Sequence, residues 1–366
     1  MKFLQCKLED VPPKKHGRVA IIGSGPAGLG AAGYLICKGY EVHVYDMLPE
    51  PGGLLIFGAP EHHIPKEPVR KGVKELVDAG VVFHTSTKVI CCREHEVRNH
   101  FDKILKKIIK SRKCLEDLVE EYDAVLIATG AWRSRRLGIP GEDLKGVYYA
   151  LEWLVDFNLA RLGYKKMKKV PRVKGRVLVI GGGLTAVDAV ETPLRYLRDE
   201  VKEVYLSYRR TRYEAPMGKN RFEKLIKEYG IKSLELTVPI KFNGLLHVKE
   251  AVLQHVMLVP VGDGKTKPVP IPGTEFKLKV DTVLIAVGEK PSPPFRRECL
   301  GVKLNDDGTI NVDEKYRTTK YKVFAAGDVK HGPSLIGPAL KSGIEAAKCI
   351  EEFLTTKEWR RKDCSS

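Results

Sequence analysis

Two stretches of this chain carry glycines in the same pattern after a short apolar run. Residues 18–32 read RVAIIGSGPAGLGAA, and residues 176–190, 158 positions later, read RVLVIGGGLTAVDAV. Each order of residues predicts a strand, a tight turn and a helix. In such a unit the first glycine makes the turn, and the second lets a pyrophosphate approach the backbone at the helix N-terminus. The third position, Gly28 or Ala186, lets the helix pack closely on the strand. Both stretches therefore favour dinucleotide binding.

An acidic residue follows the first turn at a distance that suits a ribose contact. Residues 39–46, GYEVHVYD, predict a second strand that ends on Asp46, 23 positions beyond Gly23. A carboxylate at this place can accept hydrogen bonds from ribose hydroxyls. The plainer interpretation is a polar strand end without a ligand. The complete order of strand, turn, helix, strand and acid favours the nucleotide.

The second copy replaces this acid with arginines. Residues 202–210, KEVYLSYRR, match the second strand of the first copy and place Tyr208 where Asp46 stands. Arg209 and Arg210 follow directly. A carboxylate would repel a 2′-phosphate, whereas a guanidinium pairs with it. The second turn is therefore predicted to bind NADP(H), and a solvated basic edge is the alternative.

The repeat extends beyond the two turns. Residues 123–130, DAVLIATG, return at residues 281–288 as DTVLIAVG, again 158 positions later. Each is an apolar strand that ends in small residues, where a backbone can pass close to a bound dinucleotide. Two landmarks with one shared offset indicate two homologous nucleotide-binding domains.

A segment near the C-terminus has no counterpart in the second copy. Residues 323–350, VFAAGDVKHGPSLIGPALKSGIEAAKCI, predict a strand, a Gly-Asp turn and a helix that begins near Pro338. Asp328 could hold polyol hydroxyls, and the helix N-terminus could lie against a ring edge that gains negative charge on reduction.

The chain is thus expected to fold as an α/β protein with two Rossmann-like three-layer domains, the second inserted in the first. We assign residues 1–148 and 289–366 to a discontinuous first dinucleotide-binding domain, which the family resemblance described next identifies as the FAD-binding domain, and residues 149–288 to an NADP(H)-binding domain.

These motifs together resemble the flavoproteins with two dinucleotide-binding domains, and most of all the small (β) subunit of glutamate synthase and its relatives. The resemblance runs from Arg18 to the C-terminal helix. Its further markers include PGGLLIFGAPEHHIPKE (51–67), YRRTRYEAPM (208–217) and AVGEKP (286–291).

The resemblance implies a set of contacts for each cofactor. FAD would be contacted by Gly23, Ser24, Gly25, Pro26, Ala27, Asp46, Gly53, Leu54, Gly130, Gly327 and Asp328. NADPH would be contacted by Gly181, Gly183, Leu184, Thr185, Ala186, Arg209, Arg210 and Gly288. Position 184 departs from the asparagine that is usual in the family.

The resemblance also implies that this chain and its relatives differ in how electrons leave the flavin. The relatives carry an N-terminal domain whose cysteines bind iron–sulfur clusters. Ahead of Arg18 this sequence has 17 residues and a single thiol, Cys6, and one thiolate cannot hold a cluster that needs four. We therefore expect the electrons to pass to a separate acceptor, either an acidic ferredoxin or an iron–sulfur-containing partner subunit.

A basic insertion, residues 93–113, precedes the segment that matches the family again. Helical spacing places its apolar residues on one face and its basic residues largely elsewhere. This pattern predicts a solvated helix that lies on the domain, and docking of an acidic protein is the second interpretation. The apolar set is Phe101, Ile104, Leu105, Ile108 and Ile109; the basic set is Lys103, Lys106, Lys107, Lys110 and Arg112.

The cysteines argue against a dithiol enzyme, because no C-x-x-C spacing occurs. Cys91 and Cys92 are interpreted as two small apolar side chains on a strand in a reducing cytosol, and a redox role for them is the alternative. The sequence shows no ligand cluster for a metal, so none is predicted.

The composition of the chain narrows the classes of binding partner and the cellular location that we expect. The 63 Lys and Arg residues against 46 Asp and Glu residues give a net charge of +17. Such a charge favours an acidic partner, and no recognition motif points to nucleic acid. Without a signal peptide or a run of 18 apolar residues, we expect a soluble, cytoplasmic protein with no membrane insertion.

The predicted chemistry is hydride transfer from nicotinamide C4 to flavin N5, which needs stacking at about 3–3.5 Å and little acid–base help. No catalytic residue is therefore assigned. His62 and His63 are the only nearby candidates for tuning the flavin or meeting an acceptor, and packed or solvent-facing histidines are the alternative. Two other functions remain open: a self-contained reductase of a quinone or sulfur compound, and a non-catalytic flavin-binding scaffold.

Overall fold

The computed structural model describes residues 1–14, 17–92, 100–262, 264–296 and 299–359. The chain divides into two compact units, Met1–Arg133 with Glu289–Ser366, and Ser134–Gly288. Residues 134–148, which the sequence assigned to the first domain, lie in the second unit. The reason is that β8 (Val147–Tyr149) pairs in parallel with β15 (Thr282–Ile285) of the second sheet.

The first unit is built on a parallel five-stranded sheet in the order β17, β6, β1, β2, β3. The side chains of Ala20 and Ile22 pack with α5 in one buried cluster, and Ile21 faces α1 near Gly28. Helices therefore cover both faces, as continuous apolar strands require. The bounds are β1 Arg18–Ile22, β2 Glu41–Tyr45, β3 Val82–His84, β6 Ala124–Ile127, β17 Val323–Ala325, α1 Pro26–Cys37 and α5 Leu115–Glu121.

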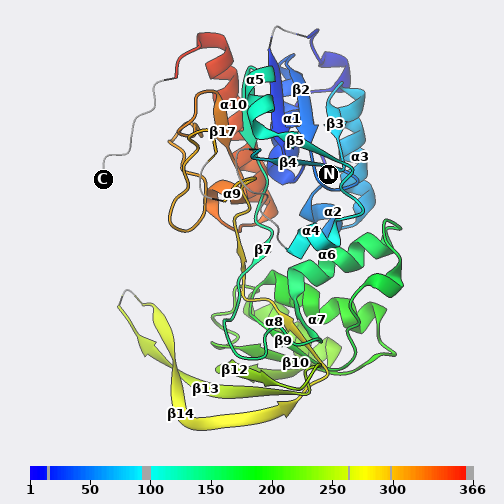
Figure 1. Ribbon diagram of the computed structural model, residues 1–366, viewed down its shortest axis with the longest axis vertical. Helices are drawn as coiled ribbons and strands as arrows, with labels where there is room; N and C mark the ends of the chain where they lie inside the picture. Colours follow the sequence, from blue (N-terminus) through cyan, green and yellow to red (C-terminus); the bar gives the residue numbers. More distant parts are fainter. Residues whose placement is uncertain (15–16, 93–99, 263, 297–298, 360–366) are drawn as a thin grey trace. The chain divides into compact units, whose positions relative to one another are not determined.

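The other elements of this unit surround the sheet (Figure 1). Strands β4 (Thr87–Ile90) and β5 (Ser111–Cys114) form a separate parallel pair. The side chain of Leu340 on α10 lies within 2.7 Å of a Cβ built at Gly30, so α10 packs closely on α1. The bounds are η1 Leu8–Asp10, α2 Leu54–Phe57, α3 Lys66–Asp78, α4 His100–Ile104, α9 Asp328–His331 and α10 Ile336–Thr356.

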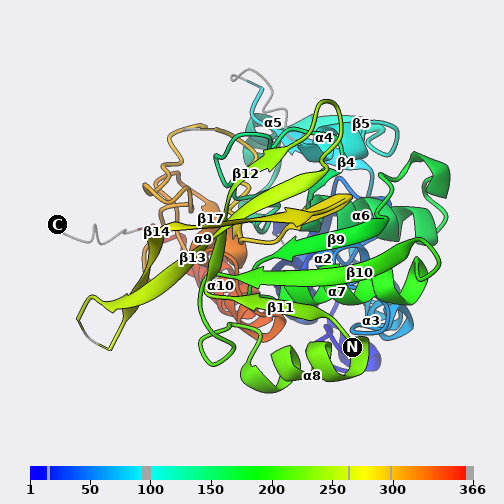
Figure 2. The ribbon, with the colours of Figure 1, turned by 90° about the horizontal axis from the view of Figure 1, so that it is seen from below.

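The second unit repeats the parallel sheet, in the order β11, β10, β9, β15, β8, and Figure 2 shows β9, β10 and β11 side by side. Val177, Val179 and Leu206 of one sheet face join a cluster with the side chains of α6, α7 and α8. The bounds are β9 Gly175–Ile180, β10 Val201–Tyr208, β11 Lys232–Glu235, α6 Ala150–Arg161, η2 Met167–Lys169, α7 Leu184–Tyr196 and α8 Lys219–Tyr229.

The opposite face of this sheet carries an antiparallel sheet instead of helices. Leu178, Ile180 and Val283 pack against side chains of β12 (Thr237–Asn243) and β13 (Glu250–Pro260). Strand β14 (Thr266–Lys279) pairs with β13 to complete a long hairpin (Figure 2). The short strands β7 (Arg133–Ser134) and β16 (Glu289–Lys290) lie where the chain passes from one unit to the other.

The two parallel sheets share one register. Ile22 of β1 is paired with Ile127 of β6, and Ile180 of β9 is paired with Ile285 of β15. Ile180 lies 158 positions after Ile22, and Ile285 lies 158 positions after Ile127. The sequence repeat is therefore a structural repeat, and the α/β fold predicted from it is confirmed.

Candidate dinucleotide-binding sites

The first glycine turn is fixed by two close backbone approaches. Gly23 has a φ of +102°, and a Cβ there would lie 2.4 Å from the carbonyl oxygen of Ala128. A Cβ at Gly28 would lie 1.9 Å from the carbonyl oxygen of Gly23. Because no real Cβ approaches an atom so closely, both positions need glycine to close the turn and seat α1 on β1.

Gly25 has a different environment from these two glycines. Its backbone is extended, with a φ of −71°, and a Cβ built on it would meet no protein atom within 4 Å. Gly25 is also the N-cap of α1, and no side chain caps this helix end, where Pro26 and Ala27 begin the first turn. The open space and the exposed helix N-terminus together suit an anionic group such as a pyrophosphate.

Asp46 holds this turn through Ser24. Its Oδ2 accepts hydrogen bonds from the Ser24 N–H at 2.7 Å and the Ser24 hydroxyl at 2.6 Å, and its Oδ1 accepts one from the Leu48 N–H at 2.9 Å. Burial raises the pKa of the Asp46 carboxyl, and these hydrogen bonds oppose the shift. Asp46 thus orders the turn as well as standing where a ribose contact is predicted, a role that the sequence pattern did not reveal.

The loop that leads into α2 packs directly on the turn. The Gly52 N–H donates to the carbonyl oxygen of Ser24 at 3.0 Å. Gly53 has a φ of +54°, and a Cβ on it would lie 2.9 Å from the Cα of Gly25. Leu54 is the first residue of α2. The predicted contacts at positions 53 and 54 are therefore next to the glycine turn.

A buried lysine supports the same loop and was missed by sequence reasoning. Lys66 is 3% exposed, and its Nζ donates to the carbonyl oxygens of Leu55 at 2.7 Å and Ala59 at 2.6 Å. An ammonium in this place satisfies carbonyls at the end of α2 that no helical N–H reaches. Its only sequence signal is a lysine directly after Pro65, at the start of a helix.

Two further segments reach the first turn. Gly130 has a φ of +73°, and the buried hydroxyl of Thr129 next to it has no hydrogen-bond partner. Gly327 also has a φ of +73°, and a Cβ on it would lie 2.8 Å from the Cβ of Ala27. Asp328 accepts a hydrogen bond from the Ser334 hydroxyl at 2.6 Å, and burial raises the pKa of its carboxyl.

The first unit therefore gathers its predicted contacts at the carboxyl ends of β1, β2, β6 and β17. The open backbone at Gly25 offers space, and the unpaired Thr129 hydroxyl offers a hydrogen-bonding group. The Asp328 carboxylate can accept hydrogen bonds from the hydroxyls of a polyol. This set of groups fits a flavin dinucleotide.

The second unit repeats the turn with the same division of roles. Gly181 has a φ of +146°, and a Cβ there would lie 2.1 Å from the carbonyl oxygen of Ala286. A Cβ at Gly183 would meet nothing within 4 Å, and Gly183 is the uncapped N-cap of α7. Leu184 is 40% exposed at the first position of α7, Thr185 follows it, and Ala186 is fully buried.

Tyr208 stands where the first unit has Asp46. The Gly181 N–H donates to the carbonyl oxygen of Ser207, as the Gly23 N–H donates to that of Tyr45. The Tyr208 ring lies 2.3 Å from a Cβ built at Gly182, and its hydroxyl donates to the carbonyl oxygen of Glu214. The ring therefore packs beneath the turn and leaves the carboxylate position without an acid.

The two predicted arginines differ in their surroundings. Arg209 is exposed. The Nη2 of Arg210 donates to the carbonyl oxygen of Thr266 at 2.8 Å, at the start of β14, so this guanidinium is partly engaged by the hairpin. Gly288 has a φ of +102°, and its carbonyl oxygen accepts a hydrogen bond from the Arg135 N–H at 2.8 Å. Arg209 is thus the better placed cation for a ligand phosphate.

Residues 17–343 match the pyridine nucleotide-disulphide oxidoreductase family. The chain belongs to this family. It is 34% identical over 347 residues to the glutamate synthase [NADPH] small chain of Azospirillum brasilense, covering 93% of this chain and 67% of that one. It is 30% identical over 368 residues to the NADPH-Fe(3+) oxidoreductase subunit beta of Geobacter sulfurreducens (strain ATCC 51573 / DSM 12127 / PCA), covering 93% of this chain and 50% of that one. The chain thus spans half to two thirds of these relatives.

Solved structures show the same fold. FprA of Mycobacterium tuberculosis in complex with NADPH has a TM-score of 0.74 at 23% identity, covering 93% of this chain and 85% of that one. Thioredoxin reductase of Lactococcus lactis has a TM-score of 0.64 at 23% identity, covering 93% and 99%. Family membership confirms the predicted class, an NAD(P)H-dependent flavoprotein oxidoreductase with FAD and NADP(H) as cofactors.

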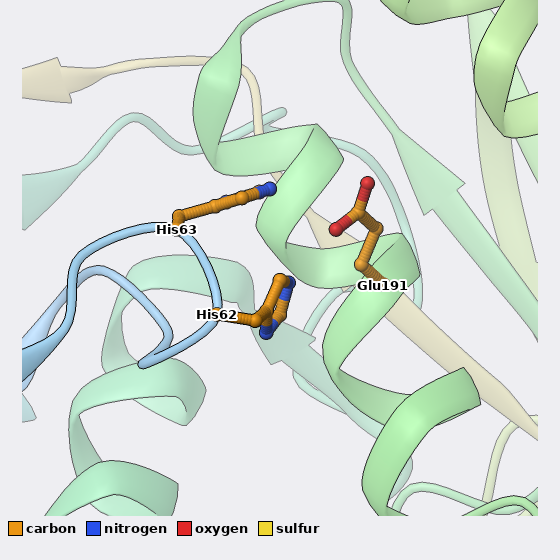
Figure 3. A group of neighbouring side chains, drawn as sticks. All are labelled: His62, His63 and Glu191. Carbon is orange, nitrogen blue, oxygen red and sulfur yellow. The ribbon is translucent and has the colours of Figure 1, made fainter.

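The two histidines considered for the flavin lie on the loop between α2 and α3. Their ring centroids are 4.4 Å apart, with His62 half-buried and His63 exposed (Figure 3). Glu191, the third side chain drawn there, belongs to α7 of the second unit, where it lies 3.9 Å from Arg195. The histidines remain candidates for contact with an acceptor.

The interpretation of Cys91 and Cys92 as two small apolar side chains in a reducing environment is wrong, because both form disulfides. Disulfides join Cys6 to Cys37, Cys91 to Cys299, and Cys92 to Cys114. The sequence spacing did not reveal these pairs because tertiary contacts make them. The parallel pairing of β4 with β5 brings residue 114 beside residue 90, and a hydrogen bond from the Cys91 N–H to the carbonyl oxygen of Pro294 brings in the third segment.

The basic insertion is only partly helical. Residues 93–99 lie outside the described part of the chain, α4 covers His100–Ile104, and β5 begins at Ser111. The apolar residues Phe101, Leu105 and Ile108 are buried, whereas Ile104 and Ile109 are half-buried. The basic set predicted for the outer face is exposed: Lys103, Lys106, Lys107, Lys110 and Arg112. Within the described residues, no helix is both long and apolar enough to span a membrane.

Proposed function

We propose that this protein takes hydride from NADPH onto FAD and passes the electrons to a separate iron–sulfur protein or partner subunit. The observation that carries the proposal is the glycine turn built twice in one register, with an acid beside the first copy and Tyr208 with an exposed Arg209 beside the second. An acid favours a ribose with a free 2′-hydroxyl, and a guanidinium favours a 2′-phosphate.

FAD is assigned to the first unit. The Gly25 backbone and the N-terminus of α1 would receive its pyrophosphate, and Asp46 would meet the ribose while holding Ser24. The full proposed set is Gly23, Ser24, Gly25, Pro26, Ala27, Asp46, Gly53, Leu54, Gly130, Gly327 and Asp328.

NADPH is assigned to the second unit. The Gly183 backbone and the N-terminus of α7 would receive the pyrophosphate. Arg209 would pair with the 2′-phosphate, and Arg210 would contribute charge while it remains bound to the Thr266 carbonyl. The full proposed set is Gly181, Gly183, Leu184, Thr185, Ala186, Arg209, Arg210 and Gly288.

The chemistry that these cofactors supply when bound is hydride transfer between nicotinamide and flavin. The chain's own part is to bind and orient them through the two turns. His62 and His63 are proposed only as groups that could meet an acceptor.

An acidic iron–sulfur acceptor fits the surface of this protein. The net charge is +17, and the lysines of the insertion are exposed. Relatives are chains of larger enzymes by their names, a small chain in Azospirillum brasilense and a subunit beta in Moorella thermoacetica. An acidic ferredoxin or an acidic iron–sulfur subunit would be attracted to such a surface.

The test is an anaerobic titration of FAD-loaded protein with NADPH and then with NADH, read at the flavin absorption band. We expect NADPH to bleach the flavin at much lower concentration than NADH. A protein that gains no flavin on reconstitution, or whose flavin neither nucleotide reduces, would contradict the proposal and favour the scaffold function.

A further inference from the structure

The turn that joins β12 to β13, residues 244–249, exposes two adjacent leucines (Figure 2). Leu245 is 94% exposed and Leu246 is 71% exposed, which makes them the two most exposed large aliphatic side chains of the described residues. Single apolar residues on a surface are normal, but two neighbours with this exposure form an apolar tip. The tip is available for a contact outside the chain.

The β12–β13 turn is held in one conformation by its neighbours. A Cβ at Gly244 would lie 1.9 Å from the carbonyl oxygen of His247, so a side chain there would clash. The Lys145 N–H donates to the Leu246 carbonyl oxygen at 3.1 Å, and the Val248 N–H donates to the Lys145 carbonyl oxygen at 2.9 Å. Val248 is 3% exposed and packs in the core between the two sheets of the second unit. An ordered turn therefore displays the two leucines.

Lysines without ionic partners flank this apolar tip. Lys145 forms an isolated β-bridge with His247 of the turn, Lys241 lies near the end of β12, and Lys249 directly precedes β13. All three lysines are exposed. Within the described part of the chain, their ammonium groups have no ion-pair or hydrogen-bond partner. The apolar tip therefore has a positively charged border.

The nearest acids in the sequence have partners of their own. The Oε1 of Glu250 accepts a hydrogen bond from the Asn243 side-chain amide at 2.9 Å. The Oδ1 of Asp143 accepts one from the Arg136 guanidinium at 2.6 Å. These carboxylates are thus engaged elsewhere, and the positive charge of the three lysines remains available to a ligand.

This combination of residues fits a lipid surface better than a protein surface. Protein interfaces are enriched in aromatic residues and Arg and depleted in Lys, and Leu is under-represented among the residues that dominate their binding energy. Residues 244–249, GLLHVK, contain no Phe, Trp, Tyr or Arg. Anionic headgroups attract Lys, whereas an exposed Leu gains from burial at the boundary between headgroups and acyl chains. The β12–β13 turn carries both of these groups.

We propose that the β12–β13 turn binds the surface of membranes that contain anionic phospholipids. Its two leucines enter the headgroup boundary, and Lys145, Lys241 and Lys249 contact the anionic headgroups. Stable attachment of this kind takes two signals, and the turn provides an apolar tip together with basic residues. The net charge of +17 favours the approach to such a surface. The contact lies on the membrane and needs no spanning helix.

The experiment measures co-sedimentation of the full chain with phosphatidylcholine vesicles that contain or lack phosphatidylserine. We expect binding only to the vesicles with phosphatidylserine, and a loss of at least about tenfold in about 1 M salt, where the screening length is about 3 Å. Leu245→Ser and Leu246→Ser should each lower the partition coefficient about tenfold. The double variant Lys145→Glu with Lys249→Glu should lower it at least about tenfold.

The first unit provides matched controls for both kinds of change. Leu8 is 48% exposed, so Leu8→Ser removes an exposed leucine at another place. Lys71 and Lys303 are exposed, and changing both to Glu alters the net charge by the same amount as the double variant of the turn. Each control should lower the partition coefficient less than about twofold, because distant charges are screened. The melting temperatures of all variants should stay close to that of the wild type, because every changed side chain is exposed.

A tryptophan reporter provides a second measurement. In Leu246→Trp, vesicles with phosphatidylserine should shift the tryptophan emission to shorter wavelength, and brominated lipid should quench it. Val261→Trp is the control, because Val261 is 59% exposed in the turn between β13 and β14 of the same unit. Its emission should not respond to the vesicles.

Three results would overturn the site. The first is no binding of the wild-type chain to vesicles with phosphatidylserine, which would leave the exposed leucines to a protein partner. The second is an equal loss of binding in the turn variants and in their controls. The third is an equal response of the two tryptophan reporters. None of these results bears on the proposed function, because vesicle binding is measured without nicotinamide or an electron acceptor.

Discussion

Asp46 accepts hydrogen bonds from both the backbone N–H and the hydroxyl of Ser24, at 2.7 and 2.6 Å. The acid that marks the first nucleotide site therefore also sets the backbone of the glycine turn. In the second unit Tyr208 takes this place and supports the turn by packing its ring against Gly182. The same turn is thus held by a charged group in one copy and by an aromatic ring in the other, which supports the proposed assignment of NADPH to the second copy.

Alanine at the open glycines should weaken cofactor binding without unfolding the protein. Gly25 and Gly183 have extended backbones, and a Cβ at either meets no protein atom within 4 Å. We expect Gly25→Ala to weaken FAD binding, and Gly183→Ala to weaken NADPH binding, by about tenfold, because the methyl group occupies pyrophosphate space. Flavin fluorescence and nucleotide titration measure these changes.

Gly28→Ala is the control for this pair. Its Cβ would lie 1.9 Å from the Gly23 carbonyl oxygen, so the apo-protein itself should lose about 1–3 kcal/mol of unfolding free energy. If Gly25→Ala lowers the melting temperature of apo-protein as much as Gly28→Ala does, the space at Gly25 is structural and the assignment fails.

Alanine substitutions of Arg209 and Arg210 should have different effects on nucleotide binding and on the hairpin. Arg209→Ala should weaken NADPH binding about tenfold to a hundredfold and leave NADH nearly unchanged, since a charge-assisted hydrogen bond contributes roughly 1.5–3 kcal/mol. Arg210→Ala should also loosen the β13–β14 hairpin by removing the bond to the Thr266 carbonyl. Hydrogen exchange of the hairpin amides distinguishes the two variants. An equal loss for NADPH and NADH in Arg209→Ala would refute the 2′-phosphate contact.

Reduction of an acidic ferredoxin by NADPH should fall steeply with salt. Steering by a charged surface raises association by about 10- to 10³-fold, and it fades as the screening length shortens from about 10 Å at 0.1 M to about 3 Å at 1 M. Ferricyanide reduction should fall less than about tenfold over the same range, because a small acceptor depends less on a docking surface.

The exposed lysines of the insertion are the expected docking site for the acidic ferredoxin. Changing Lys106, Lys107 and Lys110 to Glu should reproduce the high-salt rate at low salt. The matched control changes three exposed lysines of the second unit, Lys166, Lys168 and Lys169, to Glu. Salt-independent ferredoxin reduction, or a quinone or polysulfide that turns over far faster than any protein acceptor, would favour a self-contained reductase.

Unfolding free energy should decrease in mild acid because of His84. Burial, followed by the neighbouring His43, lowers the pKa of the His84 imidazole, and the two rings share a 2.9 Å hydrogen bond. The unfolded chain then binds more protons, so stability is fully present above the unfolded pKa of about 6.5 and is lost as pH falls toward the folded pKa. Urea unfolding at a series of pH values should show a slope that His84→Phe reduces, and an unchanged slope in that variant would exclude His84 as its source.

Much of the candidate site could be predicted from the sequence because it depends on local backbone requirements. Glycines at 23, 28 and 181 are needed wherever a strand enters a tight turn under a helix, and the structure shows the close approaches that exclude a side chain. The common offset of the two copies was sufficient to predict two equal sheets, since strand pairing follows the same hydrophobic pattern in both.

The sequence by itself therefore determined the α/β class, the repeated turn and the exchange of Asp46 for Tyr208 and Arg209. Only the tertiary structure decided which residues those turns contact. It showed that Arg210 serves the hairpin, that Lys66 holds the end of α2, and that the chain crosses into the second unit at residue 134 and not at 149. It also brought Cys91 and Cys92 to partners 208 and 22 positions away. These contacts join segments that are distant in the chain. Their geometry depends on how the sheets, loops and helices pack, and this packing cannot be predicted from the spacing of neighbouring residues.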